Sequence, residues 1–161
     1  MRGAIHHLDL TVKDPWASRA FYAAVLGFMG YREVADHDRG FDYDLATPDG
    51  FASVGIMKAA GPNARRAHDR YSPGLHHVAW NAASRADVEA MHALLKEIGA
   101  TVLDAPADYP RYGEGYYAVF FADPDGMKLE LVHVPPEGSQ QYWRERERNG
   151  IVELDHLPPG Y

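Results

Sequence analysis

The sequence predicts an α+β fold in which two βαβββ modules form a curved mixed sheet around a cleft, with the helices outside. The main observation behind this prediction is a repeat, because three landmarks of the first half recur in the same order in the second half. They are the runs His6-His7-Leu8 and His76-His77-Val78, the helix-ending glycines Gly27 and Gly99, and the turns Pro48-Asp49-Gly50 and Pro124-Asp125-Gly126. Ordered recurrence of this kind indicates two copies of one supersecondary unit, each unable to cover its own sheet.

The first half reads as strand, helix and three strands. Residues 4–12 alternate between apolar and polar side chains, which is typical of a half-buried strand. Asp14 can cap a helix that Pro15 opens and that runs to about Leu26. The apolar stripe of this helix is expected at Ala17, Phe21, Ala24 and Phe28. Further strands are predicted over residues 29–35, 41–47 and 51–57.

The second half repeats this order after a segment rich in Ala, Gly, Pro and Arg. Ser84 with Asp87 forms a variant capping box for a helix that ends at Gly99 and has Val88 and Met91 on its apolar stripe. Strands are predicted over residues 74–81, 100–104, 116–122 and 127–134. The expected organisation is therefore residues 1–58 as the first module, 59–73 as a linker, 74–134 as the second module, and 135–161 as a C-terminal helix and tail.

Composition narrows the class of protein. The 161 residues include 23 acidic and 16 basic side chains, and the net charge of -7 disfavours nucleic acid and anionic membrane surfaces as partners. The sequence has neither an apolar run of membrane-spanning length nor a signal pattern at its start, so we expect a cytoplasmic protein. The absence of cysteine leaves only nitrogen and oxygen as metal ligands, and the chain has nine histidines.

Glu130 is an anomalous charge within an apolar strand. The turn Asp123-Pro124-Asp125-Gly126 precedes a run that alternates with period two. Met127, Leu129 and Leu131 share one face of that strand, and Lys128, Glu130 and Val132 share the other. An unpaired buried charge costs several kcal/mol, so Glu130 either faces solvent or meets a cationic group.

His7 and His77 are the candidate partners of Glu130. They occupy equivalent positions in the two halves, and period two places them on the strand faces opposite the helices. Two imidazoles and one carboxylate make a facial set that suits divalent Mn, Fe, Co, Ni or Zn and leaves positions open for water and substrate. Open positions are typical of a catalytic site.

Other residues of the predicted cleft could take part in the chemistry. Asp9 follows His7 on the same face and is either a general base or a hydrogen-bond partner of His7. Tyr116 is expected to line the cleft from a neighbouring strand. The run 109–115 contains an Arg, two Tyr and two Gly. It is either a loop that closes over an anionic or aromatic substrate or a plain surface loop.

Several of these motifs resemble one known family, the glyoxalase/bleomycin-resistance/dioxygenase family of the vicinal oxygen chelate superfamily. The motifs are the runs 7–12, Ser18-Arg-Ala-Phe-Tyr22, Leu26-Gly-Phe28, 74–79 and 123–130. The resemblance covers residues 4 to 134 and implies paired βαβββ modules, a homodimer, and metal ligands at His7, His77 and Glu130. It implies a glyoxalase-type lyase, isomerase or transferase that acts on a small oxygenated substrate through a metal-stabilised enolate or alkoxide.

Departures from the family patterns keep two alternatives open. Glyoxalase I-like members have a further Glu in the first half, which also serves as a base, but residues 51–57 contain no carboxylate, and Val54 is expected opposite Glu130. Glu130 is therefore expected to be the only carboxylate ligand and a catalytic residue that doubles as the base. Extradiol dioxygenase-like members have a Tyr where this chain has Phe120, and Tyr116 or Tyr117 is the candidate catalytic group that would transfer a proton in its place. Fosfomycin-resistance transferases have a Thr where this chain has Asp9. The alternatives are an extradiol-type or other Fe(II) dioxygenase and a bleomycin-resistance-like ligand-binding protein, which needs no metal ligands.

Overall fold

The computed structural model describes residues 5–48, 50–136, 144 and 148. Most of the predicted C-terminal helix and tail lies outside the described residues. The first module contains β1 (His7–Val12), α1 (Pro15–Phe28), β2 (Arg32–His37), β3 (Gly40–Thr47) and β4 (Gly50–Lys58). The second module contains β5 (Val78–Asn81), α2 (Arg85–Glu97), β6 (Thr101–Asp108), β7 (Tyr117–Ala122) and β8 (Lys128–His133). None of the helices in the described part of the chain is long and apolar enough to cross a membrane.

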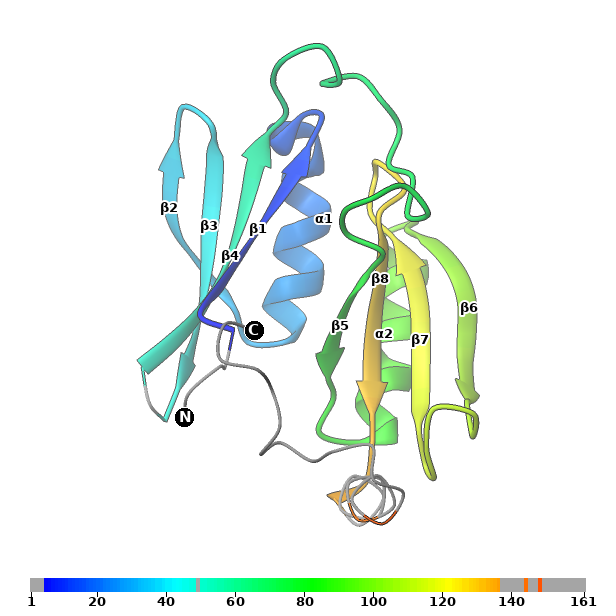
Figure 1. The fold of residues 1–161 in the computed structure, drawn as a ribbon. Coiled ribbons are helices and arrows are strands. Elements are labelled where there is room, and N and C mark those ends of the chain that lie inside the picture. Colours follow the sequence, from blue (N-terminus) through cyan, green and yellow to red (C-terminus); the bar gives the residue numbers. More distant parts are fainter. Residues whose placement is uncertain (1–4, 49, 137–143, 145–147, 149–161) are drawn as a thin grey trace.

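The two modules have the same topology, which confirms the predicted α+β fold of two βαβββ units. The strand orders are β1-β4-β3-β2 and β5-β8-β7-β6, in two separate four-stranded sheets. In each sheet the first strand runs parallel to the last, and the remaining pairs are antiparallel. The edge strands β1 and β5 face each other, and both helices lie on the same side of the sheets (Figure 1). We call the side of each sheet opposite the helices its inner face.

Both helices begin as their sequences predict. The Asp14 carboxylate accepts hydrogen bonds from the backbone N–H groups of Trp16 and Ala17 at 3.0 and 3.2 Å. Ser84 and Asp87 form a reciprocal capping box, with hydrogen bonds of 2.9 and 3.2 Å. These side chains satisfy N–H groups that the first turn of a helix leaves without backbone partners.

One apolar core runs through both modules between the sheets and the helices. It contains Leu10 and Ile56 from the first module and Met91, Leu129 and Leu131 from the second. Leu129 and Leu131 are on the core side of β8, so the predicted period-two alternation around Glu130 is confirmed.

Polar contacts also join the modules. The Tyr22 hydroxyl on α1 donates a buried hydrogen bond of 2.7 Å to Asp123 in the turn between β7 and β8. Lys13, just after β1, lies 3.5 Å from Asp125 of the same turn. The turn before Glu130 therefore anchors the second module to the first.

The predicted end of the first helix was wrong. Gly27 lies inside α1, which continues to Phe28 and has Met29 as its C-cap. The glycine with positive φ is Gly30, at 91°, and it corresponds to Gly99, at 67°, after α2. Glycine is favoured at this position because the left-handed conformation strains residues that have a Cβ atom.

The predicted apolar stripe of α1 was wrong in part, because Phe21 is half-buried against the core but the fully buried residues are others. The helix buries Pro15, Ser18, Tyr22, Val25 and Leu26, whereas Ala17 and Phe28 are exposed. The buried face is rotated because α1 packs against its own sheet and also reaches the second module through Tyr22. Several predicted strand bounds shift by a few residues: β2 begins at Arg32, β5 begins at Val78, and β6 extends to Asp108.

Candidate functional site

Glu130 lies on the inner face of the second module but is buried. Strand register places it between Ala79 of β5 and Phe120 of β7. Its exposed fraction is 1%, because the apolar side chains of Phe120 and Val132 and the aromatic residues before β7 cover this face. A carboxylate in such surroundings requires hydrogen-bond partners.

Each carboxylate oxygen of Glu130 has one partner. The Tyr116 hydroxyl donates a hydrogen bond of 2.5 Å to Oε1. The His77 Nε2 atom lies 3.3 Å from Oε2. Tyr116 precedes β7 and His77 precedes β5, so the loops at two different strands meet at this carboxylate.

The pKa values of these three side chains shift because of their surroundings. Burial raises the pKa of Glu130, while the Tyr116 hydrogen bond and the positive charge of Lys128 oppose that rise. Burial, together with the hydrogen bond to Glu130, raises the pKa of Tyr116, so its hydroxyl stays protonated and donates. Burial lowers the pKa of His77, and so do the positive charges of His76, Lys128 and Arg70 nearby. A lowered pKa favours the neutral imidazole that metal ions bind.

The second ring nitrogen of His77 is also engaged. Its Nδ1 lies 2.7 Å from Nδ1 of His76, and the His76 ring packs edge-on against Tyr71. When the His77 proton is on Nε2, this nitrogen donates to Glu130 Oε2; when the proton is on Nδ1, the Nε2 lone pair is free to bind a metal ion beside that oxygen. This tautomer leaves His77 Nε2 and Glu130 Oε2 as a neighbouring nitrogen and oxygen donor.

This donor pair fits a divalent metal ion. Ligand distances of about 2.1 Å in a tetrahedral site place neighbouring donor atoms about 3.4 Å apart, close to the 3.3 Å between His77 and Glu130. The structure does not bring His7 to this pair. In the described part of the chain, no group of three or more His, Asp or Glu side chains is close enough to hold a metal ion. His7 is exposed on β1, with its Nδ1 3.2 Å from Nδ1 of His6.

Asp9 lies on the inner face of the first module, opposite Gly55 of β4. The equivalent pair in the second module is Ala79 and Glu130. Gly55, and not Val54 as predicted, therefore occupies the position equivalent to Glu130, while Val54 faces the core. A Cβ atom on Gly55 would lie 2.5 Å from Asp9 Oδ1 and 3.0 Å from Asp42 Oδ1. Two aspartates from the flanking strands thus crowd the place where the second module has its glutamate.

Aromatic side chains form a wall beside Glu130. Tyr109 stacks on Tyr112 and meets Phe120 edge-on, and Tyr112 also contacts Tyr116. Arg111 lies over Tyr112, 4.7 Å from the ring centroid. The loop 109–116 is therefore packed on the second module next to the carboxylate.

Lys128 is a further residue of the site that the sequence motifs do not single out. Its Nζ lies 3.7 Å from the centroid of the Phe120 ring, on the inner face next to Glu130. Period two had already placed Lys128 on the face of Glu130, and this was the signal that could have identified it.

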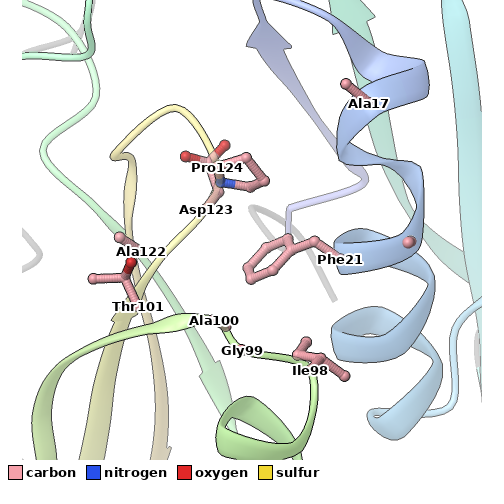
Figure 2. A pocket seen from close by; sticks show the side chains of 10 residues that line it. Ala17, Phe21, Ile98, Gly99, Ala100, Thr101, Ala122, Asp123 and Pro124 are labelled. Carbon is pink, nitrogen blue, oxygen red and sulfur yellow. The ribbon is translucent and has the colours of Figure 1, made fainter.

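Two cavities lie away from this pair. One of about 390 Å³ is lined by α1, the segment after α2 and the turn after β7, and Phe21 extends across it (Figure 2). None of His7, His77 and Glu130 lines it. The other, of about 310 Å³, is lined by Asp9, Met127 and the segment before β5, including His68. His68 Nε2 is buried and has no hydrogen-bond partner among the described residues.

Comparison with known proteins finds a family match along most of the chain. The model of the Glyoxalase/Bleomycin resistance protein/Dioxygenase superfamily matches residues 4–131. The uncharacterized protein YqjT of Bacillus subtilis is 36% identical over 128 residues, which is 80% of this chain and 97% of YqjT. A 2-epi-5-epi-valiolone epimerase from an Actinomyces species is 32% identical over 151 residues, covering 82% of this chain and 80% of the epimerase.

One solved structure resembles this chain in both fold and sequence. It is a protein from Bacillus halodurans assigned as a glyoxalase, with 30% sequence identity and a TM-score of 0.69. The match covers 83% of this chain and 97% of that protein.

Proposed function

Because this chain belongs to the glyoxalase/bleomycin resistance protein/dioxygenase superfamily, we propose that it is a divalent-metal-dependent enzyme acting on a small oxygenated substrate. The observation that carries the proposal is the His77–Glu130 pair, with 3.3 Å between its donor atoms and the Glu130 carboxylate buried and held by Tyr116. The reaction class is glyoxalase-type chemistry, in which a proton leaves a carbon next to a carbonyl group or a nucleophile adds to the substrate. The 32% sequence identity with an epimerase supports the isomerase branch of this class.

The proposed metal ligands are His7, His77 and Glu130, with Zn, Ni, Mn, Co or Fe as the candidate ions. A bound divalent ion supplies Lewis-acid stabilisation of the negative charge that develops on a substrate oxygen. Tyr116 holds Oε1 of Glu130 and so keeps Oε2 directed towards His77. The aromatic wall excludes water from the carboxylate.

Asp9 is the proposed general base. It shares the inner face of β1 with His7, so any movement that brings His7 to the pair also brings Asp9 towards the substrate. Glu130 is less suited to move a proton, because Oε1 accepts from Tyr116 and Oε2 is the proposed metal ligand.

Metal content tests the proposal directly. Wild-type protein purified without chelator and equilibrated with each candidate ion is expected to retain about one ion per chain by elemental analysis. His77→Ala and Glu130→Gln should retain far less, whereas His92→Ala, on α2, is the matched control and should retain the wild-type amount. Equal metal content in wild type and His77→Ala would refute the enzyme proposal and favour a ligand-binding protein of the bleomycin-resistance kind.

The proposed homodimer offers one route by which His7 reaches the pair. If the site forms between chains, each site takes His7 from one chain and His77 from the other. Mixing His7→Ala with His77→Ala, after partial unfolding and refolding together, then produces heterodimers with one intact site and restores part of the metal binding. If the site forms within a chain, each mixed dimer lacks an intact site and metal binding stays lost.

Oxygen consumption distinguishes the dioxygenase alternative from the proposed glyoxalase-type chemistry. We expect no uptake of oxygen by iron-loaded protein with a panel of catechols, because Phe120 occupies the position of the tyrosine in extradiol dioxygenase-like patterns. Uptake that His77→Ala abolishes would instead establish the dioxygenase. The protein is expected to work in the cytoplasm.

A further inference from the structure

Lys128 places a positive charge next to the His77–Glu130 pair. It lies two residues before Glu130 on β8, so both side chains belong to the inner face of the second module. Its Nζ is held 3.7 Å from the centroid of the Phe120 ring, and the side chain is half-buried. Among the described residues, no carboxylate lies within ion-pair distance (4.0 Å) of Lys128. A cation held over an aromatic ring is positioned without being neutralised.

Two arginines also lie around the pair, in a protein that is acidic overall. Arg111 lies over Tyr112 in the aromatic wall, and Arg70 lies over Tyr71 near His76. The chain as a whole carries a net charge of -7. Local positive charge within an acidic surface focuses negatively charged ligands onto one site.

The first module has the opposite charge at its equivalent positions. Asp9 and Asp42 flank Gly55 there, whereas Ala79 and Phe120 flank Glu130 in the second module. The first module therefore has two aspartates beside the position of Glu130, whereas apolar residues flank Glu130 itself and Lys128 precedes it on the same strand. Another acidic side chain on this face is Asp104 of β6, which lies on the far side of Phe120 from Glu130.

We propose that the ligand of the His77–Glu130 pair is a small carboxylate with a neighbouring hydroxyl or carbonyl oxygen, and that Lys128 is the residue that selects the carboxylate. This inference rests on the proposed function, because the neighbouring oxygens of the ligand are the atoms that a metal ion on His77 and Glu130 would bind. A single ammonium group suits a carboxylate. Phosphate sites usually gather several donors, such as a helix N-terminus or a bidentate arginine.

The test compares two ligands of nearly equal shape, glycolate and its neutral amide, glycolamide. Both are titrated by NMR into the zinc-loaded and the zinc-free full-length protein. Lys128→Met removes the charge and keeps an apolar stem over Phe120, and Lys96→Met, in the last turn of α2, makes the same charge change away from the site. Lys128→Gln serves as a second variant, and the NMR spectra report whether each variant is folded.

We expect Lys128→Met to weaken glycolate binding about tenfold, the loss of one charge-assisted contact, and to leave glycolamide binding nearly unchanged. Lys96→Met should alter neither. Equal losses for both ligands, unchanged glycolate binding in Lys128→Met, or no glycolate binding to the wild type would overturn the inference. If the wild type holds no zinc, the proposed function fails separately, and the zinc-free titration alone then decides whether Lys128 selects glycolate.

Discussion

At the scale of single residues, Tyr116 and Tyr117 offer a matched pair of hydroxyl groups. Tyr116 donates to the buried Glu130, and Tyr117 donates to Glu89 on α2. Tyr116→Phe is expected to weaken metal binding about tenfold or more, because it frees Oε1 and loosens the orientation of Oε2. Tyr117→Phe removes an equivalent hydroxyl and should leave metal affinity unchanged. Competition against a chromogenic chelator measures both constants, and similar values for the two variants would remove Tyr116 from its positioning role.

Gly55 is a second residue whose identity the structure explains. Gly55→Ala is expected to destabilise the protein slightly, by about 1 kcal/mol or less, because the two carboxylate ends that the new Cβ meets belong to flexible side chains that must turn away. The new Cβ would meet Asp9 Oδ1 at 2.5 Å and Asp42 Oδ1 at 3.0 Å. Urea unfolding measures the effect.

Asp9→Ala tests whether this crowding is the cause. The exposed Asp9 should tolerate removal alone, and combined with Gly55→Ala it should restore part of the lost stability. Strictly additive effects of the two changes would contradict the steric explanation.

Residue-scale prediction from the sequence was accurate for strand faces and inaccurate for what covers them. Period two placed Lys128 and Glu130 on one face and Leu129 and Leu131 on the other, as the structure confirms. The burial of Glu130 depends on loop 109–116 folding over it, and that contact joins residues 14 positions apart. Alternation along one strand contains no information about such a cover.

At the scale of elements, the end of α1 provides a test with an internal control. Gly27 is exposed within the helix, and a Cβ there would have no neighbouring atom within 4 Å. Gly27→Ala should therefore stabilise the protein by about 0.5–1 kcal/mol. Gly30→Ala should destabilise it, because Gly30 has a φ of 91°. Thermal unfolding of both variants checks the signs, and stabilisation by Gly30→Ala would refute the assignment of the helix end.

Element-scale features that depend on neighbouring residues were predicted well. Both N-caps, at Asp14 and Ser84, were recognised because a cap is a contact within one turn. The buried face of α1 was not predicted, since Tyr22 is buried where it contacts the second module and donates to Asp123, 101 residues away. Hydrophobicity alone ranked Phe21 and Phe28 above this tyrosine.

At the scale of the whole molecule, the relative placement of the two modules decides which candidate ligands meet. His77 and Glu130 belong to one module and were brought together by its own strand pairing. His7 belongs to the other module, and its distance from the pair depends on the packing between modules. The repeat predicted equivalent positions for His7 and His77, but equivalence within each module does not determine how the modules pack.

The contact between Tyr22 and Asp123 makes that packing dependent on pH. Burial raises the pKa of Asp123 in the folded protein, and the Tyr22 hydrogen bond partly opposes the rise. In the unfolded chain an aspartate has a pKa of about 3.9, so the folded state holds more protons above that pH. Stability from this group is therefore complete at lower pH and is lost as the pH rises through the raised pKa.

Asp123→Asn and Tyr22→Phe test this sign. Asp123→Asn does not titrate, so the unfolding free energy of the wild type minus that of the variant should fall as the pH rises from about 4 to neutrality. Tyr22→Phe removes a hydrogen bond that lowers the pKa of Asp123. The unfolding free energy of Tyr22→Phe, measured against that of Asp123→Asn, should therefore keep falling to a higher pH than that of the wild type. Urea unfolding across this pH range measures all three proteins. A difference between wild type and Asp123→Asn that grows with pH would show that Asp123 is stabilised as the carboxylate, and that its burial is not the dominant effect.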